Sequence, residues 1–152
     1  MPLFRRRLDA EAAGFTVGVD GHRVVIGSRE GCTMLADLDD YVGPVIRRST
    51  PKPDGRDSVA VQNAKMDYVE MAEATVLVVA LALEELVQQG VLRDDEVPAR
   101  PVMRPLDPDL ATYDYIQETY ARAESRIEWV RDVDALFRAR DIAILRPPPP
   151  VE

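Results

Sequence analysis

The sequence predicts a mainly α-helical fold with a small β element, an α+β class. Two segments, about residues 58–89 and 108–140, carry helical patterns of apolar residues with no internal glycine or proline after their first turns. A third segment, residues 15–28, alternates apolar and polar residues around an Asp-Gly pair, which indicates a β-hairpin. The 152 residues, 46% of them hydrophobic, suffice to bury one core. We therefore expect a single α+β domain over residues 15–146.

The hairpin is predicted from Asp20-Gly21, a favoured pair for the two-residue type I′ turn, in which both central residues take positive φ. The register expected from this turn pairs Val19 with His22, Val17 with Val24, and Phe15 with Ile26. One face of the hairpin is then apolar, and two strands alone are marginally stable, so helices or a third strand must cover it. Residues 141–145 are the candidate for that strand.

A short helix is predicted over residues 33–42, with Thr33 as its N-cap. Its apolar side would consist of Met34, Leu38 and Tyr41. Gly43-Pro44 is expected to end the helix. Residues 47–57, rich in proline, glycine and charge, are predicted to form an exposed linker.

The first long helix is predicted over about residues 58–89, because this stretch contains good helix formers and no breaker. Gly90 is expected to end it in the left-handed conformation, with Val91 folding back on Leu86. The second long helix is predicted to begin at Asp107-Pro108, a capping carboxylate followed by proline, and to end near residue 140. Its expected packing seam is Tyr113, Ile116, Tyr120, Ala123, Ile127, Val130, Val133 and Phe137.

The apolar run at residues 74–83 has no polar side, and such a helix is normally covered all round. The second helix can cover one side, and the hairpin and the short helix another, which leaves a third without an evident cover in the chain. Exposed Val and Leu side chains would each forgo roughly 1.5–3 kcal/mol. The favoured interpretation is self-association, with an oligomer interface at Val76, Val79, Ala80 and Leu83. The alternative is that the hairpin completes the cover within a monomer.

No set of residues in the sequence indicates a chemistry. His22, the single histidine, is interpreted as a strand residue rather than a catalytic group, and Cys32 as a small half-buried apolar residue rather than a reactive thiol. Glu70 and Glu73 are interpreted as the solvated rim of the apolar run rather than a metal or paired-carboxylate site, because the helix lacks Glu-x-x-His motifs. We expect no catalytic residues, no metal and no cofactor.

Basic residues are concentrated near the N-terminus. Residues 1–56 hold nine Arg or Lys against eight acids, a net charge of +1, and residues 57–152 hold ten against nineteen, a net charge of -9, which together give -8. Residues 1–14 are predicted to form an Arg-rich arm, and residues 147–152 a stiff proline-rich tail. The candidate contacts with an anionic partner are Arg5, Arg6, Arg7, Arg47 and Arg48.

The function predicted from these features is that of a non-enzymatic, self-associating structural or assembly protein. It would be a subunit of a larger protein complex, a virion component among the options, located in the cytoplasm or the virion. One alternative is a small dimeric nucleic-acid-binding regulator or antitoxin-like protein that uses the Arg-rich arm, and another is an accessory subunit of an enzyme. The apolar run is about half the length of a membrane span and is flanked by four carboxylates, so we expect no membrane association.

Overall fold

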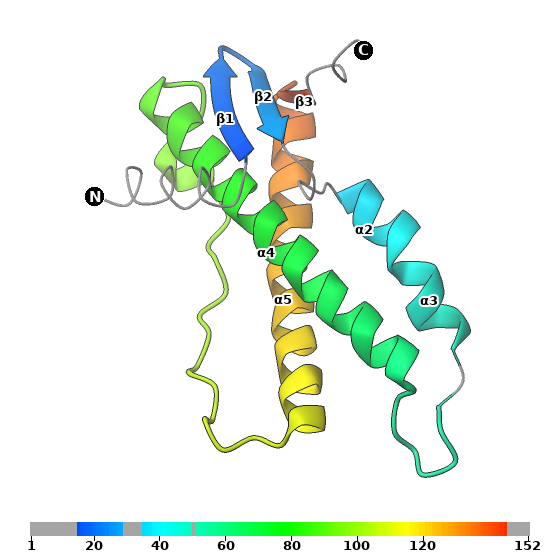
Figure 1. Cartoon of the computed structure of the whole chain (residues 1–152). Helices are drawn as coiled ribbons and strands as arrows, with labels where there is room; N and C mark the ends of the chain where they lie inside the picture. Colours follow the sequence, from blue (N-terminus) through cyan, green and yellow to red (C-terminus); the bar gives the residue numbers. More distant parts are fainter. Residues whose placement is uncertain (1–14, 29–34, 50, 146–152) are drawn as a thin grey trace.

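The computed structural model describes residues 15–28, 35–49 and 51–145, in which two long helices and a three-stranded sheet are the largest elements (Figure 1). The predicted α+β class is confirmed. The Arg-rich arm, Thr33, Met34, Cys32 and the proline-rich tail lie outside the described residues.

The sheet has the order β1-β2-β3, with β1 (Phe15–Asp20) antiparallel to β2 (Arg23–Ser28) and β3 (Ala143–Leu145) parallel to β2. The predicted third strand is confirmed. The predicted register is wrong: Asp20 pairs with Arg23, so the turn is Gly21-His22 and not Asp20-Gly21. Gly21 takes a positive φ of 57°, as the first central residue of a type II′ turn does.

The change of register leaves the apolar face of the hairpin intact. Val19 now pairs with Val24 and Val17 with Ile26, which is a shift of two residues from the predicted pairs. Because side chains alternate with a period of two, a two-residue shift keeps every side chain on its face. Val17, Val24 and Ile26 are accordingly buried.

The short helical segment is longer than predicted and has two parts, α2 (Leu35–Tyr41) and α3 (Gly43–Arg48). Gly43-Pro44 does not end the helical course, because Pro44 lies in the first turn of α3, where its missing N–H is not needed. The expected linker start at residue 47 is therefore also wrong. The backbone amide of Ile46 still donates to the carbonyl of Val42, which keeps the two parts nearly continuous.

The first long helix, α4 (Val59–Gln88), has the predicted ends. Ser58 caps it, with its hydroxyl accepting from the amide of Val61 at 3.2 Å. Gly90 has a φ of 75°, and the amide of Val91 donates to the carbonyl of Leu86 at 2.9 Å, which forms the expected Schellman motif.

The second long helix, α5 (Thr112–Ala139), begins four residues later than Pro108, so the predicted start is wrong. The Asp107 carboxylate accepts from the amide of Asp109 at 2.9 Å and closes a separate turn instead of capping the helix. At the other end, Asp141 takes the left-handed conformation with a φ of 53°, and the amide of Ile142 donates to Phe137.

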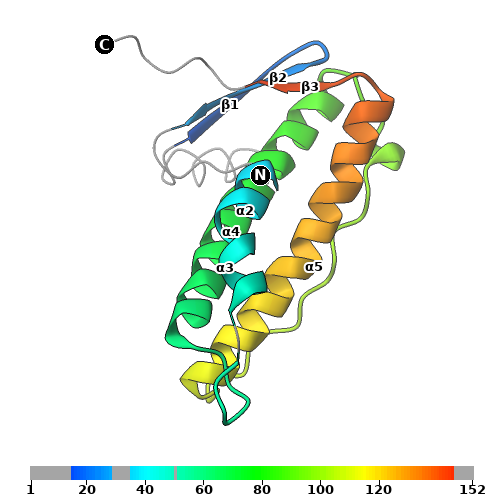
Figure 2. The same ribbon diagram turned by 90° about the vertical axis from the view of Figure 1, so that its right-hand side faces the viewer.

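The two long helices lie side by side, and the sheet lies across one end of the pair (Figure 2). Neither helix breaks, and α4 with 30 residues is about 45 Å long. The pair formed by α4 and α5 is therefore elongated. The segment α2–α3 packs along another side of α4. A 3-10 turn, η1 (Asp94–Glu96), follows α4, and residues 97–111, here called the strap, run back along the pair to α5 (Figure 1).

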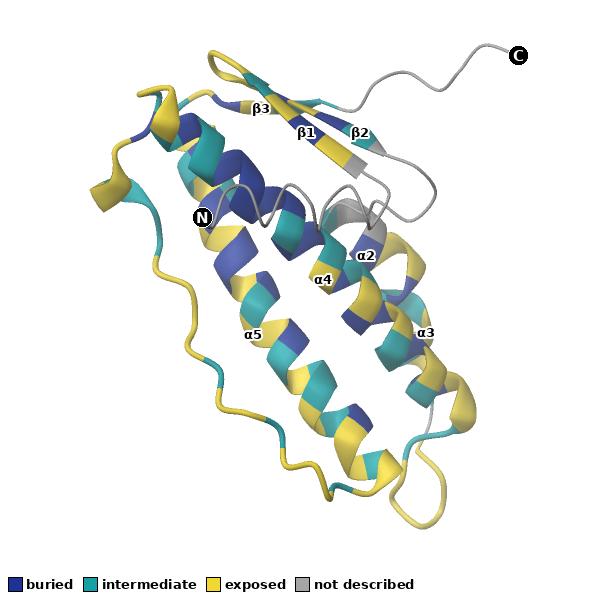
Figure 3. Cartoon of the chain, turned by 60° about the vertical axis from the view of Figure 1, so that its left-hand side comes forward, coloured by how far each residue is buried: buried dark blue, intermediate teal, exposed yellow. Residues whose placement is uncertain are grey.

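The apolar run of α4 is covered by its own chain, from α5, the sheet and α2–α3 (Figure 3). The four residues predicted as the oligomer interface, Val76, Val79, Ala80 and Leu83, are each at most 4% exposed. The expectation of an uncovered third side is therefore wrong. An interface cannot use these side chains without unpacking the core.

The predicted seam of α5 faces α4 over most of its length. Ile116, Ala123, Ile127, Val130, Val133 and Phe137 are buried, and Tyr113 and Tyr120 are half-buried. The Tyr120 ring packs against Tyr68 of α4 with 5.1 Å between centroids and a tilt of 55°. Burial raises the pKa of Tyr68 to about 12, because the charged phenolate would lose its hydration there.

Candidate functional sites: an exposed helical face and an arginine-lined pocket

The residues considered for catalysis belong to two separate elements, the β-hairpin and α4. His22 is exposed in the hairpin turn, and its backbone carbonyl accepts from the amide of Ala143 at 2.9 Å. Glu70 and Glu73 are exposed on α4. Among the described residues, no group of three or more His, Cys, Asp or Glu side chains is placed to hold a metal ion.

The segment α2–α3 carries apolar residues on two sides and buries only one of them. Leu38 and Val42, four residues apart, are buried. Tyr41 and Val45, also four residues apart, are 71% and 42% exposed. The predicted grouping of Tyr41 with Leu38 is therefore wrong, because Tyr41 lies on the outward side.

Arg48 follows Val45 by three positions, so it continues the same outward side of the helical segment. Both Arg47 and Arg48 are exposed in the last turn of α3, where a cation is favourable because the helix carbonyls end there. We call Tyr41, Val45 and Arg48 the outer face. It combines an aromatic residue, an aliphatic residue and a guanidinium on one exposed surface.

A row of exposed carboxylates lies on α5. Glu124, Glu128 and Asp132 are spaced four residues apart, so they form one row, here called the acidic row. Like charges at this spacing destabilise a helix by about 0.2–0.5 kcal/mol per pair. None of the ion pairs in the described part of the chain includes these three residues, whereas the neighbouring Arg131 lies 4.0 Å from Asp39 of α2.

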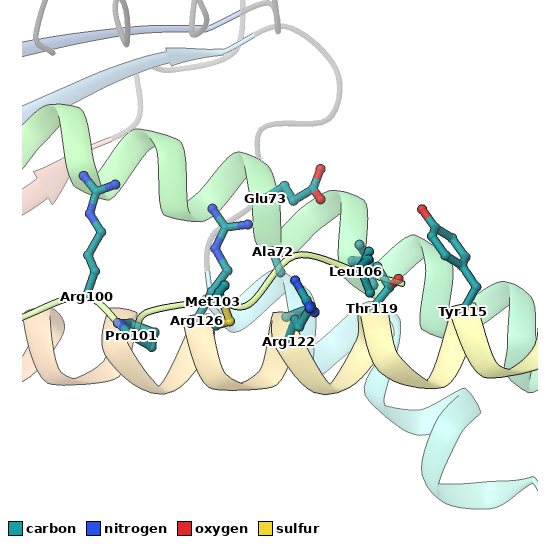
Figure 4. A pocket seen from close by; sticks show the side chains of 12 residues that line it. Ala72, Glu73, Arg100, Pro101, Met103, Leu106, Tyr115, Thr119, Arg122 and Arg126 are labelled. Atoms are coloured by element: carbon teal, nitrogen blue, oxygen red, sulfur yellow. The ribbon is translucent and has the colours of Figure 1, made fainter. Parts of the chain in front are cut away.

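A pocket of about 450 Å³ lies between α4, the strap and α5 (Figure 4). Its charged lining consists of three arginines, Arg100 of the strap and Arg122 and Arg126 of α5, with one acid, Glu73 of α4. Figure 4 shows the side chains of Arg100 and Arg126 extending toward α4. The pocket lining therefore has a formal charge of +2 in a chain with a net charge of -8.

Two buried polar atoms of this pocket have no hydrogen-bond partner in the described structure, Oγ1 of Thr119 and Nε of Arg122. The nearest carboxylate oxygen in an ion pair with Arg122 is Oε1 of Glu118, 3.7 Å from Nε, which is beyond hydrogen-bond distance. Buried groups left without a partner are uncommon in folded proteins and call for an explanation.

The strap is fixed over α5 by its first residues. The indole Nε1 of Trp129 donates to the carbonyl of Pro98 at 2.9 Å, and the guanidinium of Arg100 lies 5.3 Å from the centre of the Trp129 ring. These contacts hold Arg100 at the end of the pocket. They show that one wall of the pocket is built by specific contacts.

At the end of the helix pair away from the sheet, a polar cluster joins the linker between α3 and α4 to both long helices. Nζ of Lys65 donates to Oδ2 of Asp57 at 2.6 Å and to Oε1 of Gln117 at 2.7 Å, and Nε2 of Gln117 donates to the same Asp57 oxygen at 2.9 Å. The hydrogen bond from Lys65 lowers the pKa of Asp57, against an opposing contribution from burial. We interpret this cluster as structural.

Comparison with protein-family models, curated protein sequences and solved structures found no match. In the described part of the chain, no helix combines the length and the apolar character that crossing a bilayer requires. The outer face, the acidic row and the pocket are the candidate functional features of the described chain.

Proposed function

We propose that this protein is a non-enzymatic structural protein that self-associates and serves as a subunit of a larger assembly, in a cytoplasmic complex or a virion. The observation that carries the proposal is the outer face, where Tyr41 remains 71% exposed while Leu38 and Val42 of the same segment are buried. Tyrosine and arginine are, with tryptophan, enriched among the residues that contribute most to binding at protein interfaces. A second apolar side on a short helical segment is typical of a surface that packs on a partner.

The partner that we propose is a second copy of the chain. Arg48 of the outer face and its neighbour Arg47 are both exposed, and the acidic row of α5 offers three exposed carboxylates. Contact between them would pair opposite charges and relieve the repulsion along the acidic row. This complementarity replaces the buried residues of α4 as the basis of self-association.

We propose that this contact is heterologous, with the outer face of one copy on the acidic row of the next and without the reciprocal contact that would close a two-fold dimer. Each copy that uses its outer face leaves its acidic row available, so the assembly grows until it closes as a ring or continues as a filament. Such growth suits a structural subunit. It also predicts masses that increase with protein concentration rather than a fixed dimer.

The proposal is tested by light scattering after size exclusion, over a range of protein concentrations at low and high salt. We expect the mass to rise with concentration and to fall at high salt, because the pairing charges are exposed and screened. The double variant Arg47→Glu/Arg48→Glu should reduce the mass toward that of a monomer. A monomeric wild type under all conditions would refute the proposal.

A charge swap distinguishes direct pairing from a general effect of charge. Mixing Arg47→Glu/Arg48→Glu with Glu124→Arg/Glu128→Arg should restore association, because each variant then offers the complement of the other. Val102→Ser, a change at a strap side chain that is 96% exposed, is the matched control and should leave the mass unchanged. Failure of the swap to restore association would place the contact elsewhere.

The alternative of a nucleic-acid-binding regulator would use Arg47 and Arg48 on phosphates, since both are exposed on α3. Retention on heparin that weakens steeply with salt, and that is lost in Arg47→Glu/Arg48→Glu, would support it. Passage through heparin without retention, together with salt-sensitive self-association, would support the structural role.

A further inference from the structure

We propose that the pocket beneath the strap binds a small molecule that carries a carboxylate or phosphate group. This site is separate from the outer face and does not depend on self-association. Three arginines from two separate elements, Arg100, Arg122 and Arg126, line one cavity of about 450 Å³. That volume lies within the usual range of about 300–1,000 Å³ for small-molecule sites.

The donors in this pocket match an oxyanion. A guanidinium presents N–H groups in a planar fork that fits the oxygens of a carboxylate or phosphate. Three guanidiniums against the one carboxylate of Glu73 leave an excess of positive charge, although the chain as a whole is acidic. The pocket would therefore attract an anion, whereas the net negative charge of the whole chain repels it.

The unpaired atoms in the lining provide a second, independent observation. Oγ1 of Thr119 and Nε of Arg122 come from positions three residues apart on α5, and both are buried without a hydrogen-bond partner. Both line the same pocket. Because both atoms have almost no accessible surface, each side chain would have to turn toward the cavity before a bound oxyanion accepts from it, and the oxyanion would then satisfy groups that are otherwise costly to bury.

The rest of the lining indicates what the anionic group is attached to. The pocket also contains apolar side chains from all three surrounding segments, among them Val69, Met103 and Ala123. Tyr115 lies at the end of the pocket opposite Arg100 (Figure 4). This arrangement fits a ligand with a small apolar or aromatic body and one anionic head.

The two sources of an anionic head are distinguished with two probes that share an aromatic body, phenyl phosphate and phenylacetate. Each would be titrated into the full chain by calorimetry at constant ionic strength, with inorganic phosphate as a third probe. We expect saturable binding of at least one probe. No heat and no rise in thermal midpoint with any of the three would overturn the proposal.

Variants locate the binding. Arg126→Gln should weaken binding about 10-fold to 100-fold, the usual effect of losing a charge-assisted hydrogen bond. Arg104→Gln is the matched control, because Arg104 is an exposed strap arginine outside this pocket, and it should bind like the wild type. Equal affinity in Arg126→Gln and the wild type would show that any binding takes place elsewhere.

Thr119→Val separates a binding role from a structural one. This change removes the buried hydroxyl with little change of shape, so the ligand-free protein should have a higher thermal midpoint. Binding of the probe should become several-fold weaker in the same variant. A lower midpoint with unchanged binding would mean that the hydroxyl has a structural partner, and would overturn its assignment to the ligand.

Discussion

The apolar run of α4 and the outer face of α2–α3 both place apolar side chains where a helix would normally be polar. The rest of the chain buries the first and leaves the second exposed. At residues 74–83, α5, the sheet and α2–α3 together cover the helix, and Val79 is 3% exposed. On the outer face, Tyr41 and Val45 remain exposed although their neighbours Leu38 and Val42 are buried.

This difference shows that apolar composition on every side of a helix does not identify an interface. The apolar run at residues 74–83 predicts an interface from the sequence, yet it forms the core of a single chain. In the short segment, the chain leaves Tyr41 71% exposed and Val45 42% exposed. The contrast can be tested by placing the same substitution in each region.

The largest expected effect is that of Val79→Glu. A buried, unpaired carboxylate in the core should lower the free energy of unfolding by several kcal/mol, so the variant should be unfolded or nearly so. Val45→Glu, the matched change on the outer face, should alter stability by about 0.5 kcal/mol or less. Denaturant unfolding followed by circular dichroism compares them, and similar losses in both would contradict the contrast.

A smaller effect is expected from acid, at the cluster that ties the linker between α3 and α4 to both long helices. The pKa of Asp57 is lowered from 3.8 in the folded chain, so its ion pair contributes stability above that value and loses it as the pH falls through the lowered pKa. Asp57→Asn should lower stability at neutral pH by about 1 kcal/mol and should flatten this acid loss.

Unfolding of the wild type and of Asp57→Asn across the acidic range measures that difference. Glu118→Gln, at an exposed partner of a longer ion pair, serves as the control and should change little. Identical acid profiles for Asp57→Asn and the wild type would show that the cluster contributes no pH-dependent stability.

The smallest effect is expected at the end of α5. Asp141 occupies the left-handed position that Gly90 occupies after α4, and a residue with a Cβ is strained there. Asp141→Gly should therefore raise the free energy of unfolding by about 0.5–1 kcal/mol while leaving the assembled mass unchanged. A decrease in stability would mean that the Asp141 side chain makes a compensating contact.

Features set by short-range chemistry could be predicted from the sequence. Ser58 and Gly90 mark the ends of α4, because a capping hydroxyl and a left-handed glycine act within one turn of the helix. The predicted start of α5 is wrong because a different short-range contact forms there. The Asp107 carboxylate bonds two residues ahead and closes a turn, which competes with capping a helix.

Features that depend on long-range packing could not be predicted. The cover on α4 comes from three separate segments, and the pocket joins Glu73, Arg100 and Arg126 from three parts of the chain. No motif in the sequence marks those positions. The one local signal was the spacing of Arg122 and Arg126, four residues apart on one side of α5.

The most direct test of the central claim is the mass of the double variant Tyr41→Ser/Val45→Ser, measured by light scattering beside the wild type at matched concentrations. We predict that the wild type associates and that the variant, with unchanged helical content and thermal midpoint, remains a monomer. Association of the variant to the same mass as the wild type would contradict the assignment of the outer face as the surface through which copies of this chain assemble.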